Sequence, residues 1–271
     1  MVDGMWMTRL DGKRFGPWAV VTGASSGIGQ EFARQIAASG INLVLVSRRA
    51  EALEETGQAL QVQYDIAYRV IAVDLSEPGA DEAVAAGTAD LDVGLLISAA
   101  GTGQPGAFLA FEAEQLLAQT QLMGVSHMLL THHFSRRFAA QKRGATLLVS
   151  ALGADSGIPY HANPAAAKGL VNALGRSLHA ELKELGVGIT TLIVTPTETP
   201  LIKKMGLDAS PMPIKPMPVA QCVAEALDGV KRGKMIVVPG RLYRIMNALM
   251  PHSLVRAMTA NMMRQSTTFV G

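Results

Sequence analysis

Ala19-Val20-Val21-Thr22-Gly23-Ala24-Ser25-Ser26-Gly27-Ile28-Gly29 is the stretch that decides the fold of this chain. The branched residues that end at Thr22 predict a short strand. Apolar residues at positions 28, 32, 33, 36 and 37, followed by Gly40, predict a helix that stops at this glycine. The stretch therefore reads as a strand, a glycine-rich turn and a helix.

This turn has the chemistry of a dinucleotide site. Glycine at 23, 27 and 29 permits a tight turn and a close approach of a diphosphate, and the helix start offers free N–H groups. The spacing Gly-x-x-x-Gly-x-Gly differs from the general dinucleotide fingerprint, and the alternative is a turn that serves packing only. A second predicted strand at residues 42–46 completes a βαβ unit and favours the nucleotide. The predicted contacts here are Gly23, Ser25, Ser26, Gly27, Ile28 and Gly29.

Composition limits the class of protein. The chain has 271 residues, 49% of them hydrophobic and 17% charged, so one sizeable α/β core can form. A net charge of +2 does not indicate a nucleic-acid partner. One cysteine, Cys222, excludes an internal disulfide framework. No run reaches the ~18 apolar residues of a membrane span, and residues 1–18 do not read as a signal peptide, so a cytoplasmic protein is expected.

Strand-like and helix-like segments alternate along the chain. We expect strands at 42–46, 68–73, 93–98, 145–150, 188–195 and 234–238, and helices at about 50–62, 79–87, 112–142, 165–185 and 219–232. This predicts a doubly wound parallel sheet in a three-layer α/β/α sandwich with a single domain. Residues 1–17 form a leader, 18–239 the nucleotide-binding domain with a proline-rich substrate loop at about 197–218, and 240–271 an amphipathic helical tail.

The end of the second strand indicates which nucleotide is bound. Ser47, Arg48 and Arg49 stand where an acidic residue would bind the ribose hydroxyls of NAD. Because the arginine fork suits a phosphate, NADP(H) is the predicted cofactor and Arg48 the better candidate for its 2′-phosphate. The alternative is an ordinary solvated start of a helix.

These residues resemble the short-chain dehydrogenase/reductase family from about residue 15 to 239. Residues 22–29 match its cofactor motif, and Ser98-Ala99-Ala100-Gly101 stands where the family has Asn-Asn-Ala-Gly. The resemblance implies a Rossmann-type fold and further cofactor contacts. These are Asp74, Leu75, Ala99, Ala100, Gly101, Lys168, Pro196, Thr197 and Thr199.

The catalytic positions that the resemblance implies are largely altered. The family uses an Asn-Ser-Tyr-Lys set, in which the tyrosine protonates the substrate oxygen. Lys168 matches the lysine, but Pro164 stands at the tyrosine position and Ala151 at the serine position. Gln121 stands at the asparagine position. A proline has no proton to give, so ordinary carbonyl reduction is expected to be slow unless another group replaces the tyrosine.

Several residues near Pro164 in the sequence could replace the tyrosine as the acid. Tyr160 and His161 precede Pro164 on a loop that could turn a side chain back toward the nicotinamide. Ser150 follows the fifth strand, where sites of α/β proteins form, as do Asp155 and Ser156. For each residue the alternative is a solvated loop side chain. Lys168 has a second reading, because in the family this lysine also holds the nicotinamide ribose.

Two further segments bear on partners. His127, His132 and His133 lie in the helix predicted at 112–142, where packing is favoured over metal binding, so no metal site is predicted. Residues 241–264 form an amphipathic, methionine-rich helix interrupted by Pro251. For this helix a subunit contact is favoured over a cap on the substrate or contact with a membrane surface. The resemblance implies a homodimer or homotetramer.

The leading hypothesis is an NADP(H)-dependent oxidoreductase of the short-chain type that acts on an apolar alcohol or carbonyl substrate with a non-standard acid. Two alternatives stay open. One is a catalytically silent NADP-binding protein, and the other is non-redox chemistry, an isomerase or lyase, in the same cleft.

Overall fold

The computed structural model describes residues 6–102, 104–200 and 215–266. Their centre is a seven-stranded sheet with the order β3-β2-β1-β4-β5-β6-β7, in which every neighbouring pair is parallel. The strands are β1 (Trp18–Thr22), β2 (Asn42–Ser47), β3 (Tyr68–Ala72), β4 (Val93–Ser98), β5 (Ala145–Ala151), β6 (Gly188–Val194) and β7 (Ile236–Val237). The predicted doubly wound parallel sheet is confirmed.

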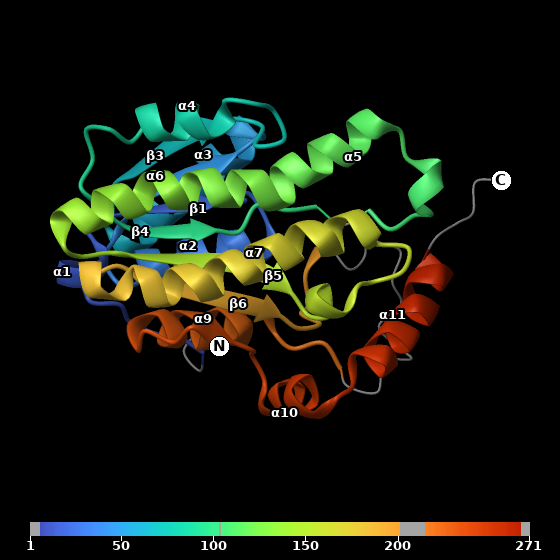
Figure 1. Cartoon of the computed structure of the whole chain (residues 1–271). Coiled ribbons are helices and arrows are strands. Elements are labelled where there is room, and N and C mark those ends of the chain that lie inside the picture. Colours follow the sequence, from blue (N-terminus) through green and yellow to red (C-terminus); the bar gives the residue numbers. More distant parts are fainter. Residues whose placement is uncertain (1–5, 103, 201–214, 267–271) are drawn as a thin grey trace.

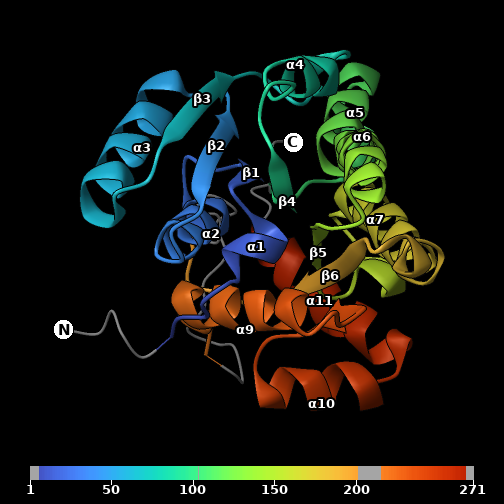
Figure 2. The same cartoon turned by 90° about the vertical axis from the view of Figure 1, so that its left-hand side faces the viewer.

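Helices cover both faces of this sheet, as Figure 2 shows end-on. One face carries α2 (Gly27–Ala37), α3 (Ala50–Tyr64) and α9 (Val219–Lys231), and the other carries α4 (Ala80–Ala86), α6 (Ser126–Gln141) and α7 (Ala162–Glu181). The remaining α-helices are α1 (Gly12–Phe15), α5 (Ala113–Thr120), α10 (Arg241–Leu249) and α11 (His252–Ser266). Figure 1 shows α6 and α7 running across the sheet and α10 and α11 at its edge.

Successive side chains along each central strand face the two helical layers in turn. Val21 and Leu45 face the layer of α2, α3 and α9, while Val20 and Val44 face that of α4, α6 and α7. Both sets are fully buried. Strands that are apolar on both faces are what a parallel sheet covered on both sides requires.

Two predicted helices differ from the structure. The helix predicted at 112–142 is divided into α5 and α6 by the π-helical turn η2 (Gln121–Val125), which hydrophobic spacing alone does not reveal. The helix predicted at 165–185 begins three residues earlier, at Ala162, so that Pro164 lies in its first turn. Proline is tolerated there because its missing N–H would have no partner within the helix. The last strand is also shorter than predicted.

The strand order places the functional cleft. β1 lies between β2 and β4 in the sheet. The chain continues from β1 toward β2 on one side and from β4 toward β5 on the other, so the loops after β1 and β4 run in opposite directions at the carboxyl edge. Ligands of doubly wound sheets bind at such a switch point. Among the described helices, none combines the length and the apolar character that crossing a bilayer demands.

The layer of α4, α6 and α7 is centred on Phe134, which is fully buried and lies 6.1 Å from the ring of Phe138. We predict that Phe134→Ala lowers the free energy of unfolding by about 3–5 kcal/mol, because the cavity cannot be refilled. The control is Val62→Ala, whose side chain is 81% exposed and which should change stability by less than about 0.5 kcal/mol. Urea unfolding of both variants measures this, and equal losses would contradict the prediction.

Candidate functional site

The loop between β1 and α2 forms a backbone cradle. Gly23 and Gly27 have positive φ angles of 70° and 58°. A Cβ on Gly29 would lie 2.3 Å from the carbonyl oxygen of Gly23, so only glycine permits this approach. Ser26, the residue before the helix, makes no side-chain cap, which leaves the first N–H groups of α2 for an anionic ligand.

Thr22 ties this cradle to the loop after β4. Its hydroxyl oxygen accepts hydrogen bonds from the N–H groups of Ala99 and Ala100, at 2.9 and 3.0 Å. A Cβ on Gly23 would lie 3.1 Å from the Cα of Ala100, so the two loops are in close contact. Next to Ala100, Gly101 has nothing within 4 Å of its Cβ position. The two loops therefore bound one cleft.

The two arginines after β2 lie beside the cradle. Arg49 donates to the backbone oxygen and the hydroxyl of Ser25, at 3.0 and 3.2 Å. Arg48 forms an ion pair with Asp74 at 3.5 Å. Burial acts to raise the pKa of Asp74, but hydrogen bonds from Ser76 and the charge of Arg48 outweigh it and lower this pKa. The exposed guanidinium of Arg49 thus reaches Ser25 in the cradle, whereas that of Arg48 is held at Asp74.

The segment after β6 approaches the same loop. The nearest atoms to a Cβ on Gly27 would be those of Thr199 and Pro200, at 3.7 and 3.8 Å. Thr197 donates its hydroxyl hydrogen to the carbonyl of Thr195 at 2.7 Å. Glu198 and Met217 pair through a backbone hydrogen bond of 2.9 Å, which joins the two ends of the predicted substrate loop. Residues 201–214 of that loop lie outside the described residues.

Lys168 lies inside a buried polar cluster. Its Nζ donates to the carbonyl of Val149 at 2.8 Å and lies 3.0 Å from Nε2 of His127. Nε2 also lies 2.9 Å from the carbonyl oxygen of Ala100, and Nδ1 of the same ring lies 2.8 Å from the hydroxyl of Ser98. His127 is fully buried and Lys168 is 5% exposed. The cluster therefore joins α6, α7 and the loop after β4.

The cluster couples the charge of Lys168 to the tautomer of His127. Burial lowers the pKa of Lys168 to about 7. Burial and the nearby Lys168 charge hold the pKa of His127 well below its usual value. Nε2 lies within hydrogen-bond distance of both the Lys168 amine and the Ala100 carbonyl, so it accepts from the amine in one tautomer and donates to the carbonyl in the other. The Ser98 hydroxyl accepts from Nδ1 in the first tautomer and donates to it in the second.

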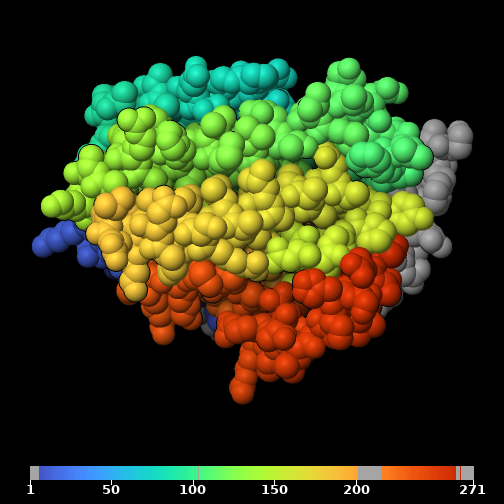
Figure 3. All heavy atoms as spheres, viewed as in Figure 1, coloured from blue at the N-terminus to red at the C-terminus, as the bar shows by residue number. Residues whose placement is uncertain are grey.

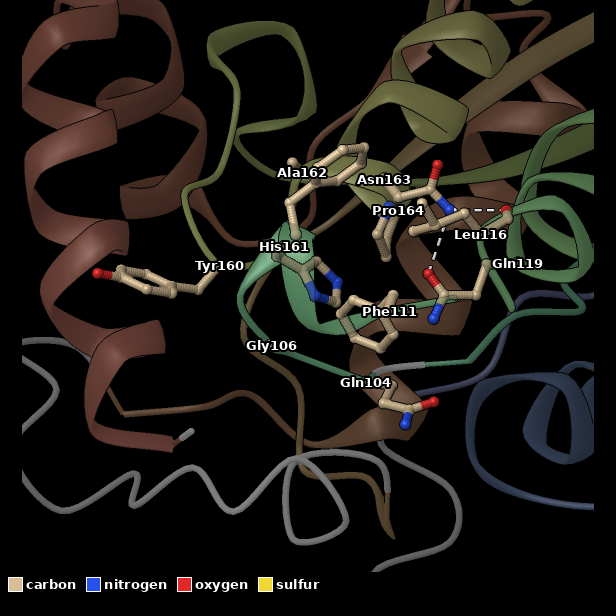
Figure 4. Close-up of a pocket in the computed structure, with 11 residues that line it drawn as sticks. Gln104, Gly106, Phe111, Leu116, Gln119, Tyr160, His161, Ala162, Asn163 and Pro164 are labelled. Carbon is tan, nitrogen blue, oxygen red and sulfur yellow. Dashed lines mark hydrogen bonds between the residues drawn. The ribbon is translucent and has the colours of Figure 1, made fainter. Parts of the chain in front are cut away.

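Pro164 lies one turn before Lys168 on α7 and borders a small cavity, shown in Figure 4. The cavity measures about 10 Å³, which is close to the smallest space that holds one water molecule. The other residues around it are Gln104, Gly106, Phe108, Phe111, Leu116, Gln119, Tyr160, His161, Ala162 and Asn163.

Two polar groups at this cavity have no hydrogen-bond partner among the described residues. They are Nδ1 of His161 and Nε2 of Gln119. Gln119 is oriented by Asn163, which donates to its Oε1 at 3.2 Å. Burial lowers the pKa of His161 to about 4, so its ring is neutral at pH 7. These two buried groups could therefore both form hydrogen bonds with one bound water or ligand atom in the cavity.

Tyr160 and His161 point in different directions. Figure 4 shows the His161 ring directed toward Phe111, whereas the Tyr160 side chain extends away from the cavity toward α11. Tyr160 packs against the small cluster of Ile158, Ala165 and Met263. Its φ angle is +59°, a strained backbone for a tyrosine. Both predicted acids therefore border the cavity beside Pro164, but the Tyr160 side chain points away from it.

Ser150 and Asp155 form hydrogen bonds or ion pairs with residues of α7, and Gln121 lies in the turn before α6. Ser150 is buried and donates to the backbone oxygen of Lys168 at 3.2 Å. Asp155 pairs with Arg176 at 2.7 Å and accepts a hydrogen bond from Asn172. Gln121 lies in the π-helical turn η2. No group of three or more candidate metal ligands occurs in the described part of the chain.

Sequence reasoning placed His127 in the packing of its helix and did not connect it to Lys168. The helical spacing did contain a signal, because His127 shares one buried stripe of α6 with Leu130, Phe134 and Phe138. A polar ring on a buried stripe needs a polar partner. Ser98, at the end of an otherwise apolar strand, was the second signal.

Comparisons with known proteins agree with this geometry. The model of the short chain dehydrogenase family matches residues 17–209. A 7β-hydroxysteroid dehydrogenase of Mediterraneibacter gnavus is 30% identical over 228 residues, which cover 83% of this chain and 86% of that enzyme. A very-long-chain 3-oxoacyl-CoA reductase-like protein of Arabidopsis thaliana is 34% identical over 213 residues, with 76% and 68% covered. The structure of a short-chain dehydrogenase from Sphingobium yanoikuyae in complex with NADPH has a TM-score of 0.79 at 26% identity, with 90% of this chain and 95% of that chain covered.

The buried amine predicts a specific dependence of stability on pH. The pKa of Lys168 is about 7 in the folded chain and 10.5 when the side chain is fully exposed to water, so between these values only the unfolded chain binds the proton. The free energy of unfolding should therefore rise with pH across this window, by a few kcal/mol, and the full penalty for burying the charge applies below it.

The variant Lys168→Met should remove this rise, whereas Lys183→Met, at an exposed lysine, should keep it. Urea unfolding of the three proteins at about pH 7 and about pH 10 makes the comparison. Identical pH profiles for the wild type and Lys168→Met would show that Lys168 does not titrate in this window.

Proposed function

Since this chain belongs to the short-chain dehydrogenase family, we propose that it is an NADP(H)-dependent oxidoreductase that interconverts an apolar alcohol and its carbonyl compound with a proton donor other than the family's tyrosine. One observation carries the proposal. The glycine cradle with its two arginines is complete, while the neighbouring cavity beside Pro164 holds a buried histidine in place of a phenol.

The described residues fit the cofactor. The cradle of Gly23, Gly27 and Gly29 suits a diphosphate, because the start of α2 has no side-chain cap and its first N–H groups can bind an anion. Arg48 and Arg49 would hold the 2′-phosphate, and the cofactor supplies the hydride when it is bound. Asp74 and Leu75 would line the adenine side, and Ala99, Ala100, Gly101, Lys168, Pro196, Thr197 and Thr199 the nicotinamide side. NADPH is named for one similar structure, that of Sphingobium yanoikuyae.

We assign the proton donor to the cavity beside Pro164. A neutral His161 offers an N–H hydrogen bond to the substrate oxygen, or holds a water between its ring and Gln119, and the water delivers the proton to that oxygen. Lys168 has a pKa of about 7, but its amine contacts Val149 and His127, so in this scheme it acts through the buried cluster and not directly on His161. Tyr160 is the second candidate for the donor, and using it requires its ring to leave Met263. Gln121 and Ser150 act as orienting residues in this scheme.

An apolar substrate suits the surroundings of this cavity. Phe108, Phe111 and Leu116 line it, and Met263 packs against the neighbouring loop. Two relatives are named for apolar molecules, a steroid dehydrogenase and a very-long-chain acyl-CoA reductase-like protein. We propose that the substrate is of this bulky, apolar kind.

A catalytically silent, nucleotide-binding role is the second candidate, and the position of Lys168 favours it. Its amine is directed to Val149 and His127 rather than to the surface of the cleft. In that role the buried cluster would preserve the fold of the cleft without a reaction. We also propose a homo-oligomer, formed through α6 and α7, where Met128 and Leu170 leave apolar surface exposed.

The cofactor assignment predicts that replacing Arg48 and Arg49 together with alanine weakens NADPH binding by about 10- to 100-fold and leaves NADH binding nearly unchanged. The reason is the loss of charged hydrogen bonds to one phosphate. A fluorescence titration with each cofactor measures both constants, and Lys183→Ala is the control on an exposed cation. Equal weakening for NADPH and NADH would contradict the assignment.

The assignment of the acid predicts that His161→Ala lowers kcat for reduction of a bulky ketone by about 100-fold or more, with NADPH affinity retained. Ser177→Ala, at an exposed serine on the same helix, should keep the rate. Absorbance of the reduced nicotinamide is followed with a panel of ketones. Full activity in both His161→Ala and Tyr160→Phe would exclude both donors.

Tight NADPH binding by the wild type without turnover of any ketone would favour the silent role. Product formation without net oxidation of NADPH would indicate isomerase or lyase chemistry instead.

A further inference from the structure

The outer side of α10 is apolar and exposed. Leu242, Ile245 and Leu249 follow the spacing of one helical face and are 53%, 48% and 77% exposed. Tyr243, on a different face, is buried against the domain. The helix therefore uses one apolar side for packing within the chain and presents another to its surroundings.

The next helix repeats this arrangement. Leu254 and Met258 of α11 are exposed, at 49% and 41%. The inner side of α11 packs on the loop after β5, with Met263 beside Ile158 and Val255 beside Gly153. We call the five exposed side chains of α10 and α11 the tail patch. Figure 3 shows these two helices, in red, along the lower edge of the molecule.

The charged side chains within the C-terminal segment that carries the tail patch are all positive. Residues 240–271 contain no aspartate or glutamate and four arginines, at positions 241, 244, 256 and 264. Arg241 and Arg256 are exposed and form no ion pair in the described part of the chain. Arg244 pairs with Glu225 of α9 at 3.1 Å. Near this pair, Lys234 lines a shallow groove together with Asp228, which is itself bound to Arg232.

A second copy of this chain is a poor match for such a face. A two-fold contact would place the same patch opposite itself, so Arg241 and Arg256 would meet arginines and no acid from this segment. Like charges brought together at an interface oppose association. Apolar side chains flanked by arginines without an ion pair match a lipid surface, which has anionic headgroups outside and an apolar acyl region beneath them.

We propose that the tail patch is a peripheral membrane-binding surface that inserts Leu242, Ile245, Leu249, Leu254 and Met258 into the interface of an anionic lipid bilayer. The helices lie in the plane of the interface, and Arg241 and Arg256 face the lipid phosphates. The inner side of α11 packs beside the cavity of His161, so binding in this pose places the substrate cleft close to the membrane. The proposal does not depend on the reaction that the cleft performs.

The test is co-sedimentation of the full chain with vesicles of phosphatidylcholine alone and of phosphatidylcholine with about one third phosphatidylserine. The wild type should bind the anionic vesicles at least roughly tenfold more tightly than the neutral ones, since two arginines contribute. The double variant Ile245→Glu/Leu249→Glu should lose this binding, and Arg241→Gln/Arg256→Gln should lose most of the preference.

The matched control is Val62→Glu/Leu117→Glu, which places the same two charges on exposed apolar positions of α3 and α5. It should bind as the wild type does. Thermal melting and NADPH titration of every variant verify that the fold and the cofactor site are intact, so a failure of the proposed reaction is separated from a failure of membrane binding.

Two results would overturn the proposal. One is a folded wild type that binds neither kind of vesicle, or that is released by salt while Ile245→Glu/Leu249→Glu binds equally well. The other is light scattering in which this double variant, and not the control, converts an oligomer to a monomer without any vesicle binding by the wild type. The second result would assign the tail patch to a copy of this chain.

Discussion

The close approach of Gly29 to the carbonyl of Gly23 is the constraint from which the cleft is built. It sets α2 directly on the end of β1, and Thr22 then holds the N–H groups of Ala99 and Ala100. The carbonyl of Ala100 meets His127 in turn. The backbone contact at the glycine turn therefore belongs to a chain of contacts that joins the turn after β1, the loop after β4 and α6, and a larger residue at Gly29 would disrupt it.

The buried cluster of Lys168, His127 and Ser98 gives the altered site its character. In a standard arrangement of this family the lysine acts on a tyrosine one turn earlier on the same helix. Here that position is Pro164, and the amine is taken up by an imidazole from a different helix. Because both basic groups are buried, their pKa values are lowered and the cluster favours a neutral amine at a pH above about 7. Lys168 and His127 thus form a buried titratable pair.

The C-terminal helices connect this site to the outside of the molecule. Met263 of α11 packs against the loop that carries Tyr160, so the direction of the tyrosine and the position of the helix are linked. The same helix exposes Leu254 and Met258 on its outer side. The helix therefore has one face on the loop after β5 and another exposed to the surroundings.

The sequence by itself determined the sheet, the nucleotide turn and the place of Pro164 four residues before Lys168, because these depend on local periodicity and on residue types at fixed spacing. It did not reveal the π-helical turn at 121–125, the partner of Lys168, the opposite directions of Tyr160 and His161, or the exposure of the tail patch. His127 and Lys168 are 41 residues apart, and spacing indicates which face of a helix is buried but not what that face meets. Only tertiary packing decides contacts between distant segments, and here it placed the amine of Lys168 beside the ring of His127.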